Sequence, residues 1–383
     1  MTTALTAERV RGDLDVLSRA GLDLECFLSE AVDSLRRAVP WVAACVATHD
    51  PATHMLTSSR KYGALVGRND RDRQLGALEY DSAEQTAFPE LAGRGVSAVG
   101  MSLETGGDVE RSARMSQMMV PGFGFGDEAR LLFRDQDRLW GALALFRGTD
   151  DGAFGEADVA FLAALSESFG RGVRAGLLTR LVDRPDPAAA DGVCGVGGPA
   201  VLVVDAAGAL VQSTPAAQAR LAALGAAVHH GDPLGTISSL VGASRRLARG
   251  DADAVPQARV RTVDGVWLVL HASALAGGTG RQGEVVVTIE EARPPEIVSL
   301  VVAAFDLTPR ERDVTQLVLQ GVDTKEIAAT LHLSAYTVQD HLKSVFDKAD
   351  VRSRRELIAR VFFDQYVPRM GSDLGPSGWF AAS

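Results

Sequence analysis

The sequence has few of the residues that mark disulfide scaffolds or membrane proteins. Its three cysteines, Cys26, Cys45 and Cys194, are odd in number and widely spaced, which fits free thiols in a reducing compartment. Hydrophobic runs are short, as at 42–47 and 201–204, and none approaches the ~20 apolar residues of a membrane span. The N-terminus has no basic segment followed by an apolar one. We therefore expect a cytoplasmic protein with no membrane partner.

Lysine is also scarce, with only four in 383 residues, and acidic residues outnumber basic ones, which gives a net charge of −10. Three of these lysines lie between residues 305 and 367, where nine basic residues nearly balance ten acidic ones. Binding to nucleic acid requires Lys and Arg to neutralise phosphates. A near-neutral segment can still bind DNA if its cations share one face, and we expect it to depend on dimerisation for affinity.

Motifs for catalysis and for phosphate or metal binding are missing. The chain contains no Gly-Lys pair, which excludes a phosphate-binding P-loop, and no HExxH, GxSxG or Cys-x-x-Cys motif. The segment 195–200 matches GxGxxA but precedes a strand-like run instead of following one. His229 and His230 have no third metal ligand placed nearby. The sequence thus predicts neither an enzyme nor a bound cofactor or metal.

The length of the chain predicts more than one hydrophobic core, and its composition indicates where the cores are separated. Segments rich in Pro, Gly and small residues occur at 183–199 and 291–295, and again from Pro368 onward. The predicted organisation is an N-terminal extension at 1–19, a first domain at 20–181, a linker at 182–199, a second domain at 200–293, a C-terminal domain at 297–367 and a tail at 368–383.

The first domain has the pattern of an α+β fold. Hydrophobic spacing predicts helices at 23–39 and 156–181, with strands at 41–48, 130–133 and 138–147 between them. Its first helix, the strand WGALALFR and the closing segment FGEADVAFLAAL resemble a GAF domain. The glycine-rich run 122–126 is expected to be a flexible loop, with a lid over a ligand pocket as the alternative.

The second domain is predicted to be α+β as well. Strands are expected at 200–205, 210–213, 258–262, 267–272 and 284–290, with a helix at 215–224. Two strands, a helical middle and three further strands resemble a PAS domain. Both resemblances imply sensor domains, for which the ligand remains open.

The C-terminal domain shows the clearest helix boundaries. Thr308, followed by proline and by Glu311, forms a capping box. Gly321 fits a left-handed C-cap, and Thr324 and Ser334 are expected to cap a short and a longer helix. A fourth helix is expected after Ser353. A short helix, a tight turn and a longer capped helix make a helix-turn-helix.

This segment closely resembles the LuxR-type helix-turn-helix. The resemblance rests on LTPRE at 307–311, on Gly321, on KEIA at 325–328, on S-x-x-TV at 334–338, and on His341, Lys348, Val351 and Arg354. It implies an all-α four-helix domain that binds double-stranded DNA as a homodimer. It also places the fourth helix at the dimer contact, through Leu357, Ile358 and Val361.

The third helix is the one expected to enter the major groove. Its outward face carries Gln339, Asp340 and Lys343, which we expect to contact adenine, cytosine and guanine, respectively. The predicted phosphate contacts are Lys325, Ser334, Tyr336, Thr337 and Lys348. The sequence departs from the family at Gln339, where many members have a basic residue.

Two hypotheses follow. The first is a DNA-binding transcriptional regulator controlled by an unknown small molecule or by a protein partner at the sensor domains. The alternative is a small-molecule-binding or enzymatic protein whose C-terminal helices serve only as an interaction module. The missing catalytic motifs favour the first.

Overall fold

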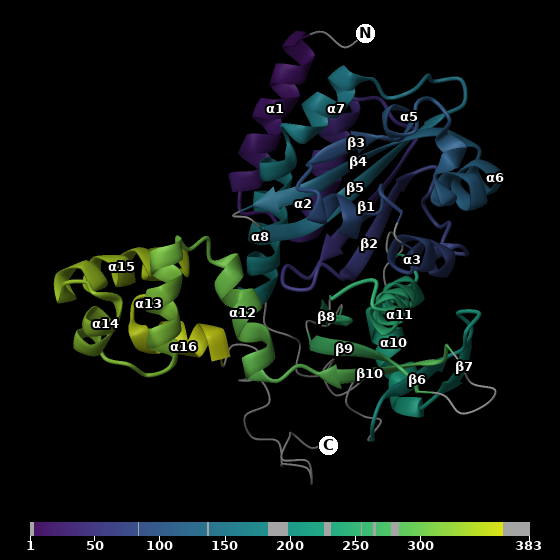
Figure 1. The fold of residues 1–383 in the computed structure, drawn as a ribbon. Helices are drawn as coiled ribbons and strands as arrows, with labels where there is room; N and C mark the ends of the chain where they lie inside the picture. The colour runs from purple at the N-terminus through teal and green to yellow at the C-terminus, as the bar shows by residue number, and fades with distance from the viewer. Residues whose placement is uncertain are drawn as a thin grey trace.

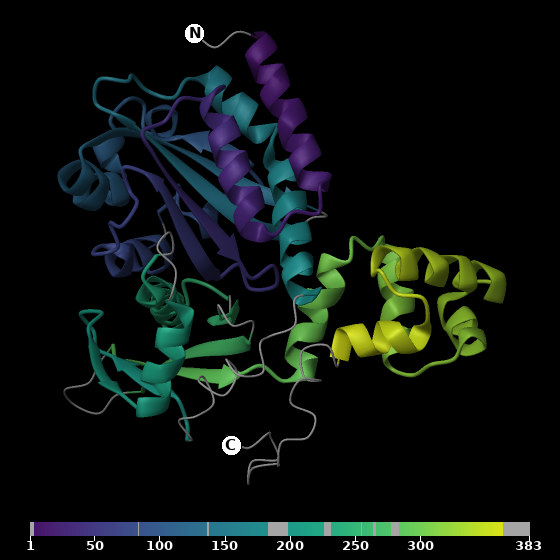
Figure 2. The same ribbon diagram turned by 180° about the vertical axis from the view of Figure 1, so that it is seen from behind.

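The computed structural model describes residues 4–82, 84–135, 138–182, 198–225, 231–253, 255–262, 266–276 and 283–362. Two five-stranded antiparallel sheets lie one above the other, and the C-terminal helices stand beside them (Figures 1 and 2). The fold is thus three packed units, two α+β and one all-α.

The first sheet has the strand order β2-β1-β5-β4-β3. Its strands are β1 (Ala43–His49), β2 (Leu56–Gly63), β3 (Ala98–Gly100), β4 (Phe125–Asp135) and β5 (Arg138–Gly148). Because successive side chains of a strand point to opposite faces, Leu143 and Leu145 of β5 join one hydrophobic cluster and Ala142 and Ala144 join another. The sheet is therefore buried on both faces.

Two sets of helices cover these faces. One face packs against α1 (Ala4–Arg19), α2 (Leu24–Arg36), α7 (Glu156–Ala163) and α8 (Ser166–Val182). The opposite face of the sheet packs against α3 (Asp72–Tyr80), α4 (Phe88–Gly93), α5 (Met101–Glu104), η1 (Val109–Arg111), the π-helix η2 (Met115–Met119) and α6 (Val120–Phe123).

Two sequence predictions for this domain need correction. The expected single helix at 156–181 is broken between α7 and α8, where the Ser166 hydroxyl donates to the Leu132 carbonyl at 2.6 Å and accepts from the Arg134 amide at 3.2 Å. The expected extension at 1–19 forms α1, whose Val10 and Leu14 are fully buried in the core with α2 and α8.

The second sheet repeats the strand order of the first, as β7-β6-β10-β9-β8. Its strands are β6 (Val201–Val204), β7 (Leu210–Ser213), β8 (Gln257–Arg261), β9 (Trp267–Ala274) and β10 (Val285–Glu291), with helices α10 (Pro215–Leu224) and α11 (Pro233–Arg249). The predicted strands and the predicted helix at 215–224 are confirmed to within a few residues. The core is almost wholly aliphatic.

Helices α3 and α11 join the two units at very close range. A Cβ atom added to Gly76 would lie 2.6 Å from the Gly235 carbonyl oxygen, so only glycine allows this approach. Asp72 accepts hydrogen bonds from the Lys61 ammonium and, at 2.7 Å, from the Asp232 amide. The two sheets are therefore rigidly connected through α3.

Helix α12 (Pro294–Ala304) begins where the sequence suggested a linker, and the expected domain start at 297 lies inside it. Arg259 donates to the Glu296 carbonyl at 3.1 Å and to the Ser299 hydroxyl at 2.8 Å. Arg174 of α8 donates to the Ala304 carbonyl at 3.1 Å. Both ends of α12 are thus held by arginines of the preceding units.

The C-terminal unit continues with α13 (Pro309–Leu319), α14 (Thr324–Leu331), α15 (Ala335–Lys348) and α16 (Arg354–Phe362). These are the four helices predicted from the capping signals.

Candidate nucleic-acid interface and an interior cavity

The helix boundaries of the C-terminal unit follow from local hydrogen bonds. The Thr308 hydroxyl accepts from the Glu311 amide at 3.3 Å, while the Glu311 carboxylate accepts from the Thr308 amide at 2.7 Å, which confirms the capping box. Gly321 is left-handed, with φ +86°. One predicted cap is wrong: Asp323, not Thr324, caps α14, because its carboxylate accepts from the amides of Lys325 and Glu326.

Helix α15 is fixed by its cap and by its buried side. The Ser334 hydroxyl accepts from the Thr337 amide at 3.0 Å, as predicted. Val338, Leu342 and Val345 face the core, where α13 and α14 meet them. This packing holds α14 and α15 as a helix-turn-helix and leaves one side of α15 in solvent (Figure 1).

That outer side carries the residues predicted to contact bases. Gln339, Asp340 and Lys343 are exposed, and Tyr336 keeps 74% of its surface accessible. Within the described part of the chain, no hydrogen bond or ion pair engages these four side chains. The face is therefore free to meet a polar partner.

The predicted phosphate contacts divide into two groups. Lys325 at the start of α14 is exposed, and the hydroxyls of Ser334 and Thr337 lie 2.8 Å apart at the N-terminus of α15. Lys348, in contrast, donates to the Glu311 carboxylate at 2.7 Å and ties α15 to α13. Its charge is thus already matched inside the domain.

Glu311 is buried and has a second role beyond the capping box that the sequence predicts. Burial raises the pKa of its carboxyl, but hydrogen bonds from Lys348, Ser344 and Thr308 outweigh burial and lower that pKa to about 2. Its ionised carboxylate therefore links α13 to α15. A cap signal gives no hint of this second role.

The predicted dimer contact is largely covered. Leu357 and Val361 of α16 are 0% exposed and belong to the same hydrophobic cluster as α12, while Ile358 is half-buried. Helix α12 lies between α8 and α16 (Figure 1). The proline-containing segment at 291–295 predicts a linker, and a linker signal does not indicate that a helix covers α16.

A partly open cavity of about 70 Å³ lies between the first sheet and the short helices α3, η2 and α6, and Gly235 of α11 also lines it. Its apolar walls include Cys45, Ala144, Met118 and Phe123. Phe123 ends α6 and Phe125 begins β4, so the glycine-rich run at 122–126 is not simply a loop. Phe123 of this run lines the cavity, and the lid over a ligand pocket stays a prediction.

The structure does not test the remaining sequence candidates. Cys194, the segment 195–197 and the pair His229 and His230 lie outside the described residues. Across the described ranges, no cluster of His, Cys, Asp and Glu has the arrangement of a metal site. Nor does any described helix have the length and apolarity needed to cross a membrane.

Comparison with known proteins identifies one part of the chain. Residues 306–361 match the family described as bacterial regulatory proteins, luxR family. The transcriptional regulatory protein DesR of Bacillus subtilis is 39% identical over 67 residues, which are 17% of this chain and 34% of DesR. The nitrate/nitrite response regulator protein NarL of Escherichia coli is 44% identical over 50 residues, 13% of this chain and 23% of NarL.

The chain spans only a small share of the curated relatives, down to 6% of a mycobacterial regulator. Among solved structures, a GAF domain of a Coxiella burnetii phosphoenolpyruvate-protein phosphotransferase aligns with 45% of this chain and 94% of its own, at 13% identity and a TM-score of 0.28. The family assignment thus rests on the C-terminal helices: residues 306–361 form a LuxR-type helix-turn-helix domain.

Proposed function

We propose that this protein is a sequence-specific, DNA-binding transcriptional regulator that acts as a homodimer in the cytoplasm and has no catalytic role. The observation that carries the proposal is the free polar face of α15 within a luxR-family domain. A helix with this exposed face, supported by a second helix, is suited to the major groove.

In this proposal, Gln339, Asp340 and Lys343 contact bases, because their side chains have the donors and acceptors that base edges require. Lys325, Ser334, Tyr336 and Thr337 contact phosphates. Lys348 holds Glu311 instead, and so positions α15.

We propose further that residues 20–181 and 200–293 are GAF-like and PAS-like sensor domains for a small molecule or a protein partner. Their repeated strand order and flanking helices support this assignment. Control passes through α12, because Arg174 and Arg259 hold that helix while it covers Leu357 and Val361. A dimer contact through α16 requires α12 to move or is restricted to Ile358 and its exposed neighbours.

The test is selection of binding sites from random duplex DNA, followed by affinity measurements at several salt concentrations. The double variant Gln339→Ala, Lys343→Ala should lose about 5- to 150-fold in affinity per base contact removed, which corresponds to ~1–3 kcal/mol. Its melting temperature should stay unchanged, since both side chains are exposed and unpaired.

The matched control is Gln212→Ala, Arg9→Ala, which likewise removes one glutamine and one positive charge, here an arginine, at exposed positions of β7 and α1. The control should bind like the wild type. Absence of salt-sensitive binding to any selected DNA, with the protein folded, would overturn the proposal.

A further inference from the structure

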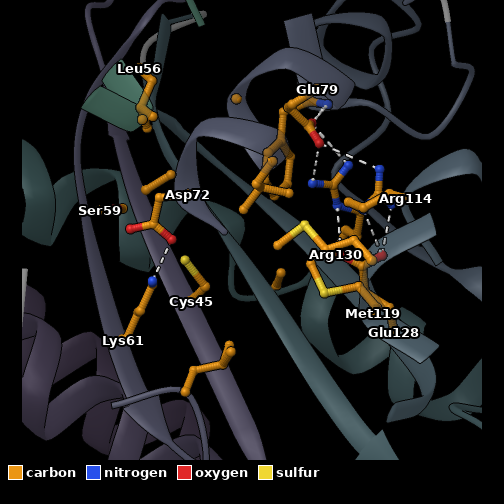
Figure 3. Close-up of a pocket in the computed structure, with 18 of the residues that line it drawn as sticks. Cys45, Leu56, Ser59, Lys61, Asp72, Glu79, Arg114, Met119, Glu128 and Arg130 are labelled. Carbon is orange, nitrogen blue, oxygen red and sulfur yellow. Dashed lines mark hydrogen bonds and ion pairs between the residues drawn. The ribbon is translucent and has the colours of Figure 1, made fainter. Parts of the chain in front are cut away.

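The cavity of the first unit is bordered by charges that are already matched. Figure 3 shows them in two groups, Lys61 with Asp72 on one side and the arginines Arg114 and Arg130 with their carboxylates on the other. What such a cavity accepts depends on whether any of these charges is free.

The arginine group is closed on itself. Arg114 donates to Glu128 at 2.7 and 3.1 Å, and Arg130 donates to Glu79 at 2.9 and 3.0 Å. All four side chains are at least nine-tenths buried. The Arg130 guanidinium also lies over the ring of Phe88, 3.5 Å from its centroid. Arg114 also pairs with Glu84 at 3.4 Å, so three carboxylates engage the two cations and no buried positive charge is left for a ligand.

The lysine group is closed as well. The Lys61 ammonium donates to the Arg68 carbonyl, to the Asn69 side chain at 2.8 Å and to the Asp72 carboxylate. These three bonds use all three hydrogens of the ammonium group. Arg68 is the remaining cation of the lining, but 47% of its side chain is exposed and its guanidinium lies over the ring of Phe123. It therefore lies at the Phe123 edge of the cavity, toward solvent, and not in the buried interior.

His49 differs from these groups. Its Nε2 atom lies 3.1 Å from the Tyr80 hydroxyl, while its buried Nδ1 atom has no hydrogen-bond partner among the described residues. The residue is 2% exposed and lines the cavity. Burial lowers the pKa of the imidazole to about 3, so it is neutral at physiological pH. The neutral ring can form one further hydrogen bond at Nδ1, and because that atom has almost no accessible surface, a ligand reaches it only when the lining shifts.

We infer that this cavity binds an uncharged, mainly apolar small molecule that directs one hydrogen-bonding group to His49. The inference rests on the sensor role proposed for the first domain. A charged ligand would enter a low-dielectric space in which every buried counter-charge is already engaged, and an unpaired buried charge is strongly unfavourable. An apolar ligand instead gains the contacts of Met118, Ala144 and Phe123.

The dimensions fit a small molecule. The volume of about 70 Å³ exceeds the ~10–15 Å³ that a single buried water needs but is about half of the ~150 Å³ of a cavity that binds benzene, so an aromatic ligand requires the lining to shift. Met118 and Met119 are flexible side chains that adapt their shape to a ligand. Phe123 covers the cavity from the four-residue helix α6, next to Gly124 with φ +70°.

The test uses four probes of similar size on the full chain, by calorimetry at neutral pH: phenol, toluene, benzoate and benzylammonium. Phenol should saturate one site per chain, and toluene should bind about 2- to 10-fold more weakly, because it lacks the hydrogen bond. Benzoate and benzylammonium should bind at least about tenfold more weakly than phenol. Cyclic AMP, an anion with a large polar surface, should not bind.

Two variants locate the probe. Ala144→Leu fills the wall of the cavity and should weaken phenol at least about tenfold, whereas Ala222→Leu on the exposed side of α10 should leave phenol binding unchanged. His49→Phe keeps a ring but removes the nitrogen, so phenol and toluene should bind equally well. If Ala144→Leu fails to fold, the ratio of phenol affinity to toluene affinity in His49→Phe tests the inference: a ratio that stays at the wild-type value contradicts it.

The inference is overturned if benzoate or cyclic AMP binds more tightly than phenol, if folded Ala144→Leu binds phenol like the wild type, or if no uncharged probe saturates. DNA binding is measured on the same samples. Intact DNA binding with a failed probe series rejects the ligand class alone, while loss of DNA binding in the wild type rejects the proposed function.

Discussion

The two sheet units and the C-terminal helices place their charges in opposite ways. In the first unit, Arg114, Arg130 and Glu128 lie in the interior and pair with one another. In α13–α16, Glu311 is the single charged side chain among the described buried residues, Lys348 and Arg354 are half-buried and engaged within the domain, and most other charges face solvent. The net charge of −10 therefore does not indicate which charges a partner can reach. Interior charges maintain the fold, and surface charges are available for binding.

The largest effect should come from breaking the interior network. Glu128 is 0% exposed and accepts from Arg114. Glu128→Leu leaves two buried guanidinium groups short of a carboxylate, so we expect a loss of about 3–5 kcal/mol in unfolding free energy. Urea denaturation checks this. The control Glu8→Leu, at an exposed position of α1, should change stability by less than ~0.5 kcal/mol. Equal effects of the two variants would contradict the interior role.

The next effect concerns the joint between the sheet units. A Cβ atom at Gly242 would lie 2.8 Å from the Asp81 amide nitrogen, so Gly242→Ala should destabilise the protein by about 1–3 kcal/mol. Gly12→Ala in α1 meets nothing within 4 Å and should stabilise by ~0.5–1 kcal/mol. Thermal unfolding compares them. A stabilising Gly242→Ala would show that α3 and α11 are not in contact in solution.

The sequence predicted local structure far better than long-range contacts. The capping box at Thr308 and the Ser334 cap are signals a few residues long, and the structure contains both. The role of α12 could not be predicted in this way, because two prolines read equally well as a linker or as the first turn of a helix. Likewise, the pairing of Arg259 with Asp50 joins residues more than 200 positions apart.

The same limit applies to the candidate site. Helical periodicity placed Gln339 and Lys343 on the exposed face of α15 without reference to the rest of the chain. The burial of Leu357 and the ion pair of Lys348, however, depend on which other helix packs against them. Periodicity indicates that a side is apolar, but it does not identify the surface that covers it.

A smaller, pH-dependent effect should mark Glu311. Its folded pKa of about 2 lies below the ordinary value near ~4.3, so its ionised form stabilises the domain fully above about pH 5. That contribution is lost as the pH falls toward the folded pKa. Glu311→Gln should therefore destabilise the protein by about 1–3 kcal/mol at neutral pH, and by progressively less between about pH 5 and pH 3. Melting temperatures of both proteins across this range check the sign. A gap that widens on acidification would contradict it.

The smallest expected effects distinguish Lys325 from Lys348 by protein stability and by the salt dependence of DNA binding. Lys325→Ala should leave stability within ~0.5 kcal/mol of the wild type but reduce the slope of log affinity against log salt by about 0.9, as expected for one lost phosphate contact. Lys348→Ala should cost about 1–2 kcal/mol in stability and leave that slope unchanged, because its ammonium is bound to Glu311. An equal drop in slope for both variants would mean that Lys348 leaves Glu311 when DNA binds. In that case a charge that is paired inside the domain in the free protein contacts phosphate in the complex. The difference in charge placement between the sheet units and the C-terminal helices then holds only for the free protein.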